Sequence, residues 1–209
     1  MRHGWRKGDY LIILVAASGN SYMHYLAGRF PGKIGMIMSP SYAQKPKYYF
    51  PYALDNGAFL DWNENAFIKL LLKARTWHKP MFTVAPDVVG SHEETIKLWP
   101  RWYEKIKSFD YPVAFVCQEG CQPKDVPREA DVCFIGGKST KWKLGHAERF
   151  VGICKHLHIG RVSTYNRYKW AETFADSVDG SKLFAGGPAR LQPLIDYFEG
   201  SKQCQLFST

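Results

Sequence analysis

Short runs of apolar and β-branched residues recur along the chain, and each run ends at glycine, proline or polar residues. Eight such runs occupy residues 10–17, 33–39, 52–55, 81–88, 113–118, 132–136, 158–163 and 177–180. Their length and composition are typical of buried strands, and segments of helical character separate most of them. The pattern therefore predicts strands that alternate with helices, the order that builds a parallel sheet.

Six helices are predicted between the strands, at residues 21–30, 64–77, 92–107, 141–156, 165–175 and 188–198. Two connections are reduced: residues 40–50 hold two prolines and are expected to form a loop, and residues 123–130 allow at most a helical turn. Eight strands predict a small (β/α)8 barrel of the TIM type. Such barrels usually take about 250 residues and rarely fewer than about 200, so a chain of 209 residues is nearly minimal. An open, doubly wound sheet is the competing fold.

Composition adds a domain count and a class of partner. The chain has 45% hydrophobic residues and no low-complexity linker, so residues 1–209 are expected to form a single domain. No apolar run reaches the roughly 20 residues of a membrane-spanning helix, and the N-terminus does not resemble a signal peptide. A cytosolic protein is therefore expected. Lys and Arg number 28 against 19 acidic residues, and the net charge of +9 favours a polyanionic partner such as a nucleic acid.

The cysteines and histidines predict no metal site. Five cysteines at irregular spacing favour free thiols over a disulfide framework. Cys117, Cys121 and His146 carry ligand atoms, but their spacing fits no common zinc pattern. His156 and His158 are expected to precede the seventh strand and to lie at the opposite face of the barrel from the loops that carry chemistry, as structural residues.

Polar or glycine residues stand at the ends of five predicted strands. In parallel folds, reactive groups lie on the loops at the C-terminal ends of the strands. These positions are held by Asp55, Asp87, Gln118, the pair Gly136 and Gly137, and Asp179.

Each of these features also has an ordinary structural explanation. Asp55 and Asn56 open a turn that brings up Phe59, whose ring suits a planar ligand, although the same residues suit a simple turn or a helix cap. Asp87 can accept hydrogen bonds from the edge of a guanine-like base, or cap a helix. The Gln118 amide can both donate to and accept from a base edge, or be satisfied within its loop.

Taken in order, these pieces resemble the queuine tRNA-ribosyltransferase superfamily, which contains the tRNA-guanine transglycosylases and their relatives that act on DNA. The family's Asp-Ser-Gly-Gly-Phe motif is similar to residues 55–59, its next strand-end aspartate to Asp87, and its Val-Gln-Gly motif to residues 116–120. Its Ile-Gly-Gly motif is similar to residues 135–137. Its glycine-containing strand, helix and two aspartates three residues apart are similar to residues 158–180, where the aspartates are Asp176 and Asp179.

The resemblance covers residues 54–180 and departs from the tRNA enzymes at three points. Their zinc site, built from cysteines and a histidine after the nucleophile, has no counterpart, because only Cys204 follows Asp179. The chain is also shorter, and Asn56 and Ala58 replace serine and glycine. These features, with the sequence Asp-Ser-Val-Asp-Gly, are more similar to the phage and bacterial branch called DpdA, which replaces guanine in DNA with a 7-deazaguanine. The resemblance therefore favours DNA over tRNA as the partner.

The resemblance implies covalent base exchange without a cofactor. Asp179 corresponds to the nucleophile that attacks the anomeric carbon of the sugar, and Asp176 to a supporting residue. Asp55 would move protons, while Asp87, Gln118, the backbone around Gly137 and the Phe59 ring would hold the base. Exchange by double displacement retains the configuration of the sugar.

Three predicted loops on the same rim interleave basic and aromatic residues, which suits phosphates and unstacked bases. The alternative is that these residues form solvated helix faces and core aromatics. The basic residues expected to bind nucleic acid are Lys45, Lys47, Lys138, Lys141, Lys143, Arg161, Arg167 and Lys169.

Three other functions remain open from the sequence. A glycosidase that removes the base and stops would share the nucleophile but admit water. A tRNA-guanine transglycosylase would share the mechanism but act on tRNA. A nucleic-acid-binding module without catalysis would keep the basic rim, although the presence of both Asp55 and Asp179 argues against it.

Overall fold

The eight strands form one closed parallel barrel in which each strand pairs with its neighbours in chain order and β8 returns to β1. The computed structural model describes residues 11–15, 21–60, 62–180, 184 and 188–206. The strands are β1 (Ile12–Val15), β2 (Ile34–Met38), β3 (Tyr52–Leu54), β4 (Thr83–Val84), β5 (Val113–Cys117), β6 (Val132–Ile135), β7 (His156–Ile159) and β8 (Ser177–Asp179). The predicted (β/α)8 barrel of the TIM type is therefore confirmed, and the open sheet is excluded.

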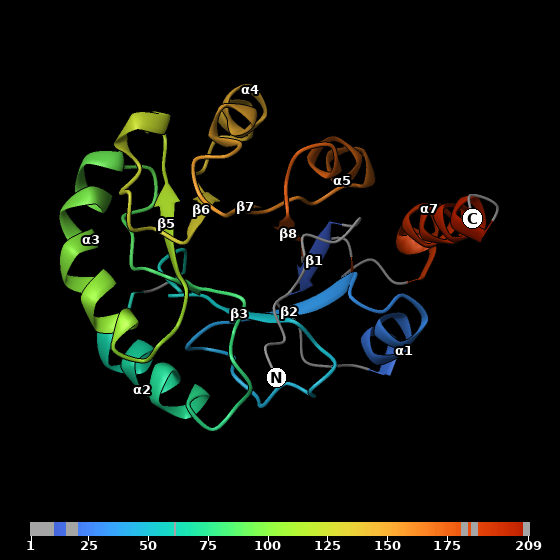
Figure 1. Cartoon of the computed structure of the whole chain (residues 1–209), viewed down its shortest axis with the longest axis horizontal. Coiled ribbons are helices and arrows are strands. Elements are labelled where there is room, and N and C mark those ends of the chain that lie inside the picture. The colour runs from blue at the N-terminus through green and yellow to red at the C-terminus, as the bar shows by residue number, and fades with distance from the viewer. Residues whose placement is uncertain (1–10, 16–20, 61, 181–183, 185–187, 207–209) are drawn as a thin grey trace.

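Helices surround the barrel (Figure 1). They are α1 (Ser21–Arg29), α2 (Glu64–Ala74), α3 (His92–Lys107), α4 (Thr140–His146), α5 (Tyr165–Glu172) and α7 (Pro188–Leu206), with short 3-10 turns η1 (Pro123–Asp125) and η2 (Ala147–Phe150). Side-chain caps begin several of them: Asn63 opens α2, Ser91 opens α3 and Thr164 opens α5. In Figure 1, α7 lies beside α1, where the Phe30 and Phe198 rings pack 5.1 Å apart.

Alternation along the strands divides the core into two layers. Leu14, Ile37, Phe82 and Val116 belong to a cluster inside the barrel. A larger cluster, to which the intervening residue Ile13 belongs, fills the space between the strands and the helices. Residues of one strand that differ by two positions therefore share the interior, which decides where the polar residues of β7 and β8 point.

The predicted boundaries hold approximately for most elements and are wrong for four. The fourth strand, predicted at residues 81–88, is only Thr83–Val84, so Asp87 lies on the loop that follows it. The seventh strand, predicted at residues 158–163, runs from His156 to Ile159. Its two histidines face the barrel interior, and Leu157 belongs to the outer layer. The fourth helix ends at His146 and η2 follows it, and α7 continues to Leu206. The short connections were predicted correctly: residues 40–50 contain no helix, and η1 is a single turn.

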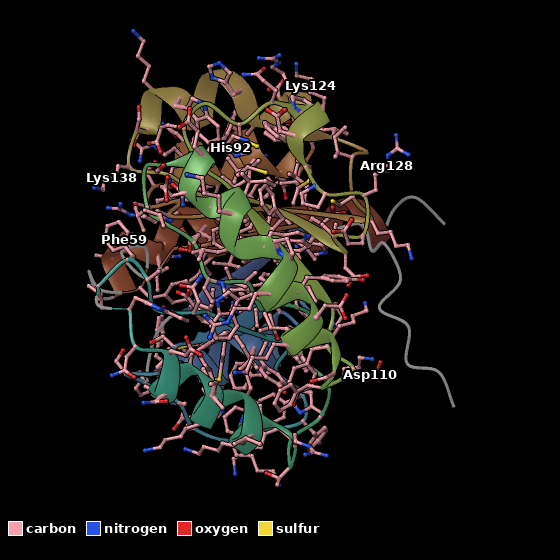
Figure 2. All side chains as sticks on the ribbon, turned by 90° about the vertical axis from the view of Figure 1, so that its left-hand side faces the viewer. Phe59, His92, Asp110, Lys124, Arg128 and Lys138 are labelled. Carbon is pink, nitrogen blue, oxygen red and sulfur yellow. The ribbon has the colours of Figure 1, made fainter. Side chains whose placement is uncertain are left out.

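The two ends of the barrel differ in character. In Figure 2, Phe59 and Lys138 lie on one side of the molecule, where the strands end, and Asp110 and Arg128 lie on the other, where the strands begin. At the N-terminal end, the Leu157 backbone N–H donates to Asp176 Oδ2 over 2.7 Å, and the Val113 N–H donates to Asp131 Oδ2 over 2.9 Å. In the described part of the chain, no helix has the length and hydropathy needed to cross a membrane.

Candidate active site

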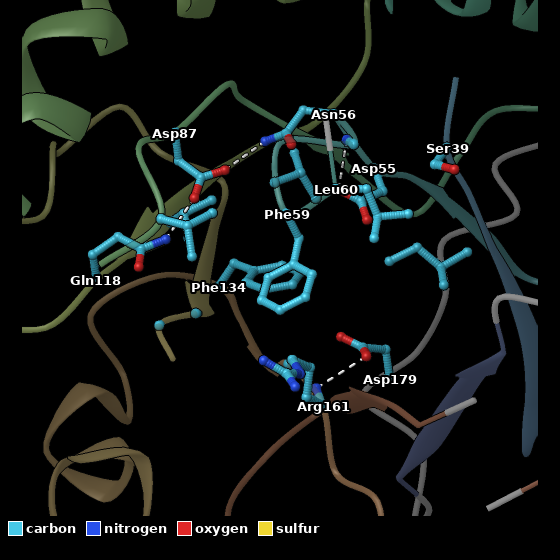
Figure 3. A pocket seen from close by; sticks show the side chains of 18 of the residues that line it. Ser39, Asp55, Asn56, Phe59, Leu60, Asp87, Gln118, Phe134, Arg161 and Asp179 are labelled. Carbon is cyan, nitrogen blue, oxygen red and sulfur yellow. Dashed lines mark hydrogen bonds between the residues drawn. The ribbon is translucent and has the colours of Figure 1, made fainter. Parts of the chain in front are cut away.

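A pocket of about 290 Å³ opens at the C-terminal end of the barrel. Its wall is mostly apolar and includes Ile37, Val84, Val116 and Phe134. The charged and amide side chains that line it are Asp55, Asn56, Asp87, Gln118, Lys143, Arg161 and Asp179. The strand ends named from the sequence therefore meet in a single pocket, as Figure 3 shows.

Asp179 is the last residue of β8 and points into this pocket. Its Oδ1 accepts a hydrogen bond of 2.9 Å from the Arg161 backbone N–H, and its Oδ2 lies 3.3 Å from His158 Nε2. The carboxylate passes close to Gly160, where an added Cβ would lie 3.3 Å from Oδ2 and 2.9 Å from the Phe134 ring. Glycine at this position thus leaves room for the carboxylate and for a ligand beside it.

The sequence-based placement of His156 and His158 is wrong. Both residues lie in β7 rather than before it, and alternation turns both side chains into the barrel. Ser177 Oγ lies 2.7 Å from His156 Nε2 and 2.7 Å from His158 Nδ1. A continuous chain of hydrogen bonds therefore runs from His156 through Ser177 and His158 to Asp179.

Burial fixes the charge of the two histidines in this series of hydrogen bonds. It lowers the pKa of His156 to about 3, and it also lowers the pKa of the fully buried His158, so both rings are neutral near pH 7. A neutral imidazole donates through one nitrogen and accepts through the other. Because ionised Asp179 can only accept, His158 donates from Nε2 and accepts at Nδ1 from the Ser177 hydroxyl, which in turn accepts from His156.

Asp55 follows β3 and carries a strongly perturbed carboxyl group. Its Oδ1 accepts a hydrogen bond of 3.2 Å from the Gly57 N–H. The pKa of Asp55 is raised to about 7, mainly by burial and in smaller part by the charges of Asp179 and Asp87, while backbone hydrogen bonds oppose the shift. A carboxyl group with this pKa can both release and accept a proton at neutral pH, which is what a general acid and base requires.

Asp87 is held between two amides. Asn56 Nδ2 donates to its Oδ1 over 2.7 Å, and Gln118 Nε2 donates to its Oδ2. Burial raises the Asp87 pKa, and these two hydrogen bonds oppose the rise. The amides are anchored in turn, because Asn56 also donates to the Ala85 carbonyl and Gln118 Oε1 accepts from the Gly90 N–H. Asn56 and Gln118 therefore orient Asp87, which keeps unused lone pairs on both oxygens.

The pocket is polar at both ends and aromatic between them. In Figure 3, Asp87 and Gln118 lie at one end, Asp55 and Asp179 at the other, and the rings of Phe59 and Phe134 between them. The Phe59 side chain is half exposed, and the guanidinium carbon of Arg161 lies 4.3 Å from the centre of its ring. Such a stacked pair covers part of the pocket and offers a flat surface to a planar ligand.

Two glycines after β6 let the chain pass close to the pocket. Both Gly136 and Gly137 line it. Gly137 adopts φ +86, and an added Cβ would lie 2.6 Å from Glu119 Oε2. A side chain at residue 137 would therefore have a strained backbone and would displace the Glu119 carboxylate.

Two of the residues assigned from the sequence lie elsewhere than expected. Asp176 was expected beside the substrate, but it precedes β8 at the opposite end of the barrel, where its carboxylate accepts the Leu157 N–H. Lys143 was expected on an exposed rim, but it is buried in the pocket wall and its Nζ donates to the Gly160 carbonyl over 2.9 Å. Burial lowers the Lys143 pKa, while the nearby Asp179 charge raises it.

The remaining rim cations fall into two groups. Lys45, Lys47, Lys138, Lys141 and Arg161 are exposed. Arg167 is half buried beside Lys143 and Arg161, whereas the Lys169 Nζ lies 3.6 Å from the centre of the Tyr197 ring and 3.4 Å from Glu172 Oε2. The Lys169 ammonium is therefore engaged within the protein.

The aromatic residues of the rim loops are mostly packed. Tyr168 is buried, Trp170 contacts Phe174, and Tyr49 contacts His24 of α1. Tyr48 and Tyr49 are exposed, at 87% and 43%. The core-aromatic interpretation is therefore correct for Tyr168 and Trp170 and not for Tyr48 and Tyr49.

Sequence reasoning missed His158, Ser177 and the buried position of Lys143. A signal for the first two was present, because polar residues alternate with apolar ones in His156-Leu157-His158-Ile159 and in Ser177-Val178-Asp179. That alternation places the histidines on the same side of the sheet as Asp179. No comparable signal marks Lys143, whose burial depends on how α4 lies over β7.

Comparisons with known proteins assign no family or function to the chain. No family model matches the chain, and no curated protein matches its sequence. Among solved structures, the chain is similar to the YdjI aldolase from Escherichia coli K12, with 10% sequence identity and a TM-score of 0.45 over 82% of this chain and 75% of that chain. At this identity and TM-score the likeness supports no conclusion about this chain.

Proposed function

We propose that the protein is a guanine transglycosylase that exchanges guanine in a nucleic acid, and in DNA rather than tRNA, for a 7-deazaguanine base. The observation that carries the proposal is the polarity of the pocket. Two carboxyl groups, one with a pKa of about 7, face each other at one end, and an amide-held carboxylate faces them across aromatic rings. This arrangement suits a nucleoside whose sugar lies at the end with Asp55 and Asp179 and whose base reaches Asp87 with its edge.

Base recognition follows from the chemistry of Asp87. The Watson-Crick edge of guanine presents two neighbouring N–H donors, and a carboxylate whose oxygens have free lone pairs can accept both. Asn56 and Gln118 hold that carboxylate in one orientation through their amide hydrogens. Phe59 packs on the face of the base. A 7-deazaguanine has the same edge, so one pocket serves both the leaving and the incoming base.

In the first half of the reaction, Asp179 attacks the anomeric carbon and the bond from that carbon to guanine N9 breaks. The protonated form of Asp55 gives its proton to the departing base, so guanine leaves neutral. The products are free guanine, a covalent sugar ester on Asp179 and an ionised Asp55. His158 donates to the second carboxylate oxygen and keeps the attacking group in place.

In the second half, ionised Asp55 takes the N9 proton from the incoming base, and that nitrogen attacks the anomeric carbon from the same face. The ester bond to Asp179 breaks, and both carboxyl groups return to their starting state. Configuration is retained because the anomeric carbon is inverted twice, once in each displacement. The mostly apolar wall of the pocket disfavours the entry of water, which favours transfer over hydrolysis.

The exposed cations on the pocket side of the barrel support a nucleic-acid substrate. Lys138 and Arg161 directly follow residues that line the pocket, and the net charge of the chain is +9. An enzyme that acts on a base within a strand must turn that base out of its stack, and cations that hold the flanking phosphates assist this step.

The deciding experiment incubates the purified full chain separately with duplex DNA and with tRNA, each together with radiolabelled guanine or a 7-deazaguanine. We expect label in DNA in the wild type and none in the Asp179→Asn variant. Label in tRNA alone would overturn the choice of DNA. Release of free guanine without incorporation of label would show that the enzyme hydrolyses the bond to the base instead of exchanging the base.

A further inference from the structure

A second cluster of reactive side chains lies outside the pocket, between α3 and the loop that follows β5. It consists of His92, the first residue of α3, together with Cys121 and Asp125. One ligand atom from each residue lies within 4.8 Å of the others. We propose that these three side chains bind one zinc ion.

The spacing and the chemistry of the donors both suit zinc. Zinc binds imidazole nitrogen at about 2.0–2.1 Å and thiolate sulfur at about 2.3 Å in tetrahedral sites, so donors bound to one ion lie roughly 3.3–3.8 Å apart. His92 Nε2 and Asp125 Oδ2 are already 3.7 Å apart. Nitrogen, sulfur and carboxylate oxygen are zinc ligands, whereas magnesium and calcium prefer oxygen alone.

The His92 ring supplies an independent argument. Its Nδ1 is buried and has no hydrogen-bond partner among the described residues, and its Nε2 is farther from Asp125 than a hydrogen bond would place it. A mostly buried imidazole whose nitrogens lack close partners is costly in a fold. Metal coordination would give one ring nitrogen the close partner that it lacks.

Charge balance favours a divalent ion at this position. When zinc binds, the Cys121 thiol loses its proton to solvent, so one thiolate and one carboxylate offset the two positive charges of the ion. The resulting group is neutral overall, which suits the buried Cys121. The Asp125 side chain is 30% exposed, so the ion can enter from solvent and keep water in its fourth position.

The ion would connect two loops that carry parts of the pocket. His92 follows Gly90, whose N–H donates to Gln118 Oε1, and Cys121 follows Gln118 by three residues. The cluster differs from the Cys117, Cys121 and His146 set considered from the sequence, because Asp125 and His92 come together only in the fold. It also differs in position and ligands from the zinc site of the tRNA enzymes. Zinc would therefore fix the loops that hold Asp87.

Metal content tests this site without reference to catalysis. The full chain is purified under reducing conditions, dialysed against micromolar zinc and then against metal-free buffer, and its metal is counted. We expect about one zinc per chain in the wild type, and a rise in melting temperature when zinc is added. Cys121→Ser and His92→Gln should each weaken zinc binding at least about tenfold, since even residues that only support metal ligands contribute about 10- to 100-fold.

Cys154→Ser is the matched control, because it removes a thiol outside the cluster. It should bind zinc as the wild type does. Cobalt provides a second measurement, since a thiolate-to-cobalt absorption band should appear in the wild type and in Cys154→Ser but not in Cys121→Ser. A wild-type protein without stoichiometric zinc would overturn the proposal, as would a Cys121→Ser variant that binds like the wild type. Neither result would affect the exchange reaction proposed for the pocket.

Discussion

The two aspartates of Asp-Ser-Val-Asp, Asp176 and Asp179, lie at opposite ends of the same short strand. Asp179 enters the pocket, where it contacts His158 and the Arg161 N–H. Asp176 lies before β8 and closes the adjacent strand by accepting the Leu157 N–H. Two residues of β8, Ser177 and Val178, therefore separate a carboxylate that enters the pocket from one that supports the fold.

A second aspartate, Asp131, has the same structural role as Asp176. Asp131 precedes β6 and accepts the Val113 N–H of β5, just as Asp176 precedes β8 and accepts the Leu157 N–H of β7. In both cases the carboxylate satisfies a backbone donor at the N-terminal end of the neighbouring strand. An aspartate before a barrel strand thus supports the fold, and an aspartate at the end of one is available to a ligand.

The largest expected effect separates these two aspartates. Asp179→Asn removes the proposed nucleophile, so exchange should fall at least about 10³-fold while nucleic-acid binding stays close to that of the wild type. Single-turnover incorporation of labelled base and a binding titration measure the two quantities. Asp176→Asn is the control. Its exchange rate should stay within about threefold of the wild type, and its free energy of unfolding should fall by about 1–3 kcal/mol, because a partly buried hydrogen bond is weakened. The opposite result would move the nucleophile to Asp176.

Asp55 should have the next largest effect. Asp55→Asn removes the group that moves the proton, and exchange should fall by about 10²- to 10⁴-fold. In the wild type, guanine release needs protonated Asp55, so its single-turnover rate should fall as pH rises through about 7, while transfer to the incoming base should rise over the same range. Rates of the two half-reactions measured across pH test this. Wild-type profiles without a change near pH 7 would exclude Asp55 as the proton carrier.

His158 should matter less, because it acts through Asp179. Replacement by Gln keeps a donor near the Asp179 carboxylate but loses the link to Ser177, and His158→Ala loses both. We expect kcat to fall about 10-fold in the first variant and about 100-fold in the second, with KM little changed, as for groups that orient a reacting residue. Equal losses in both variants, together with a lower melting temperature, would indicate a purely structural role.

The sequence predicts the barrel well because the barrel depends on local patterns. Buried strands, polar strand ends and helix caps such as Ser91 all leave periodic or positional signals. It also predicts that Asp55, Asp87 and Asp179 share a pocket, since strand ends converge in a parallel barrel. It fails where two roles use the same residue type, as for Asp176, because a shift of three residues along β8 exchanges one end of the barrel for the other.

Charge and burial are harder to predict because they depend on packing between distant segments. Lys143 and Lys169 are both basic residues in rim helices, yet one is buried against Gly160 and the other lies over the Tyr197 ring. The metal-ligand cluster likewise joins residue 92 to residues 121 and 125 only when α3 packs beside η1. No pattern within either segment marks these contacts.

The raised pKa of Asp55 also predicts how stability depends on pH. Unfolded aspartate has a pKa of about 3.9, and the folded value is about 7, so the folded protein binds the proton more tightly. Stability is therefore highest below about pH 4 with respect to this group and declines as pH rises toward 7. Asp55→Asn should add on the order of 1–3 kcal/mol to the free energy of unfolding at pH 8 and almost nothing at pH 4. Urea unfolding of both proteins at the two pH values measures the difference.

The smallest expected effect compares two lysines that carry the same charge at different ends of the proposed interface. Lys138 is exposed beside the pocket, whereas Lys169 is engaged by Glu172 and Tyr197. Lys138→Gln should weaken DNA binding by a few fold and reduce the slope of log affinity against log salt by about 1, as the loss of one phosphate contact requires. Lys169→Gln changes the net charge equally and should leave both quantities unchanged. Equal effects from the two variants would mean that the overall charge of the protein, rather than a defined rim, attracts the nucleic acid.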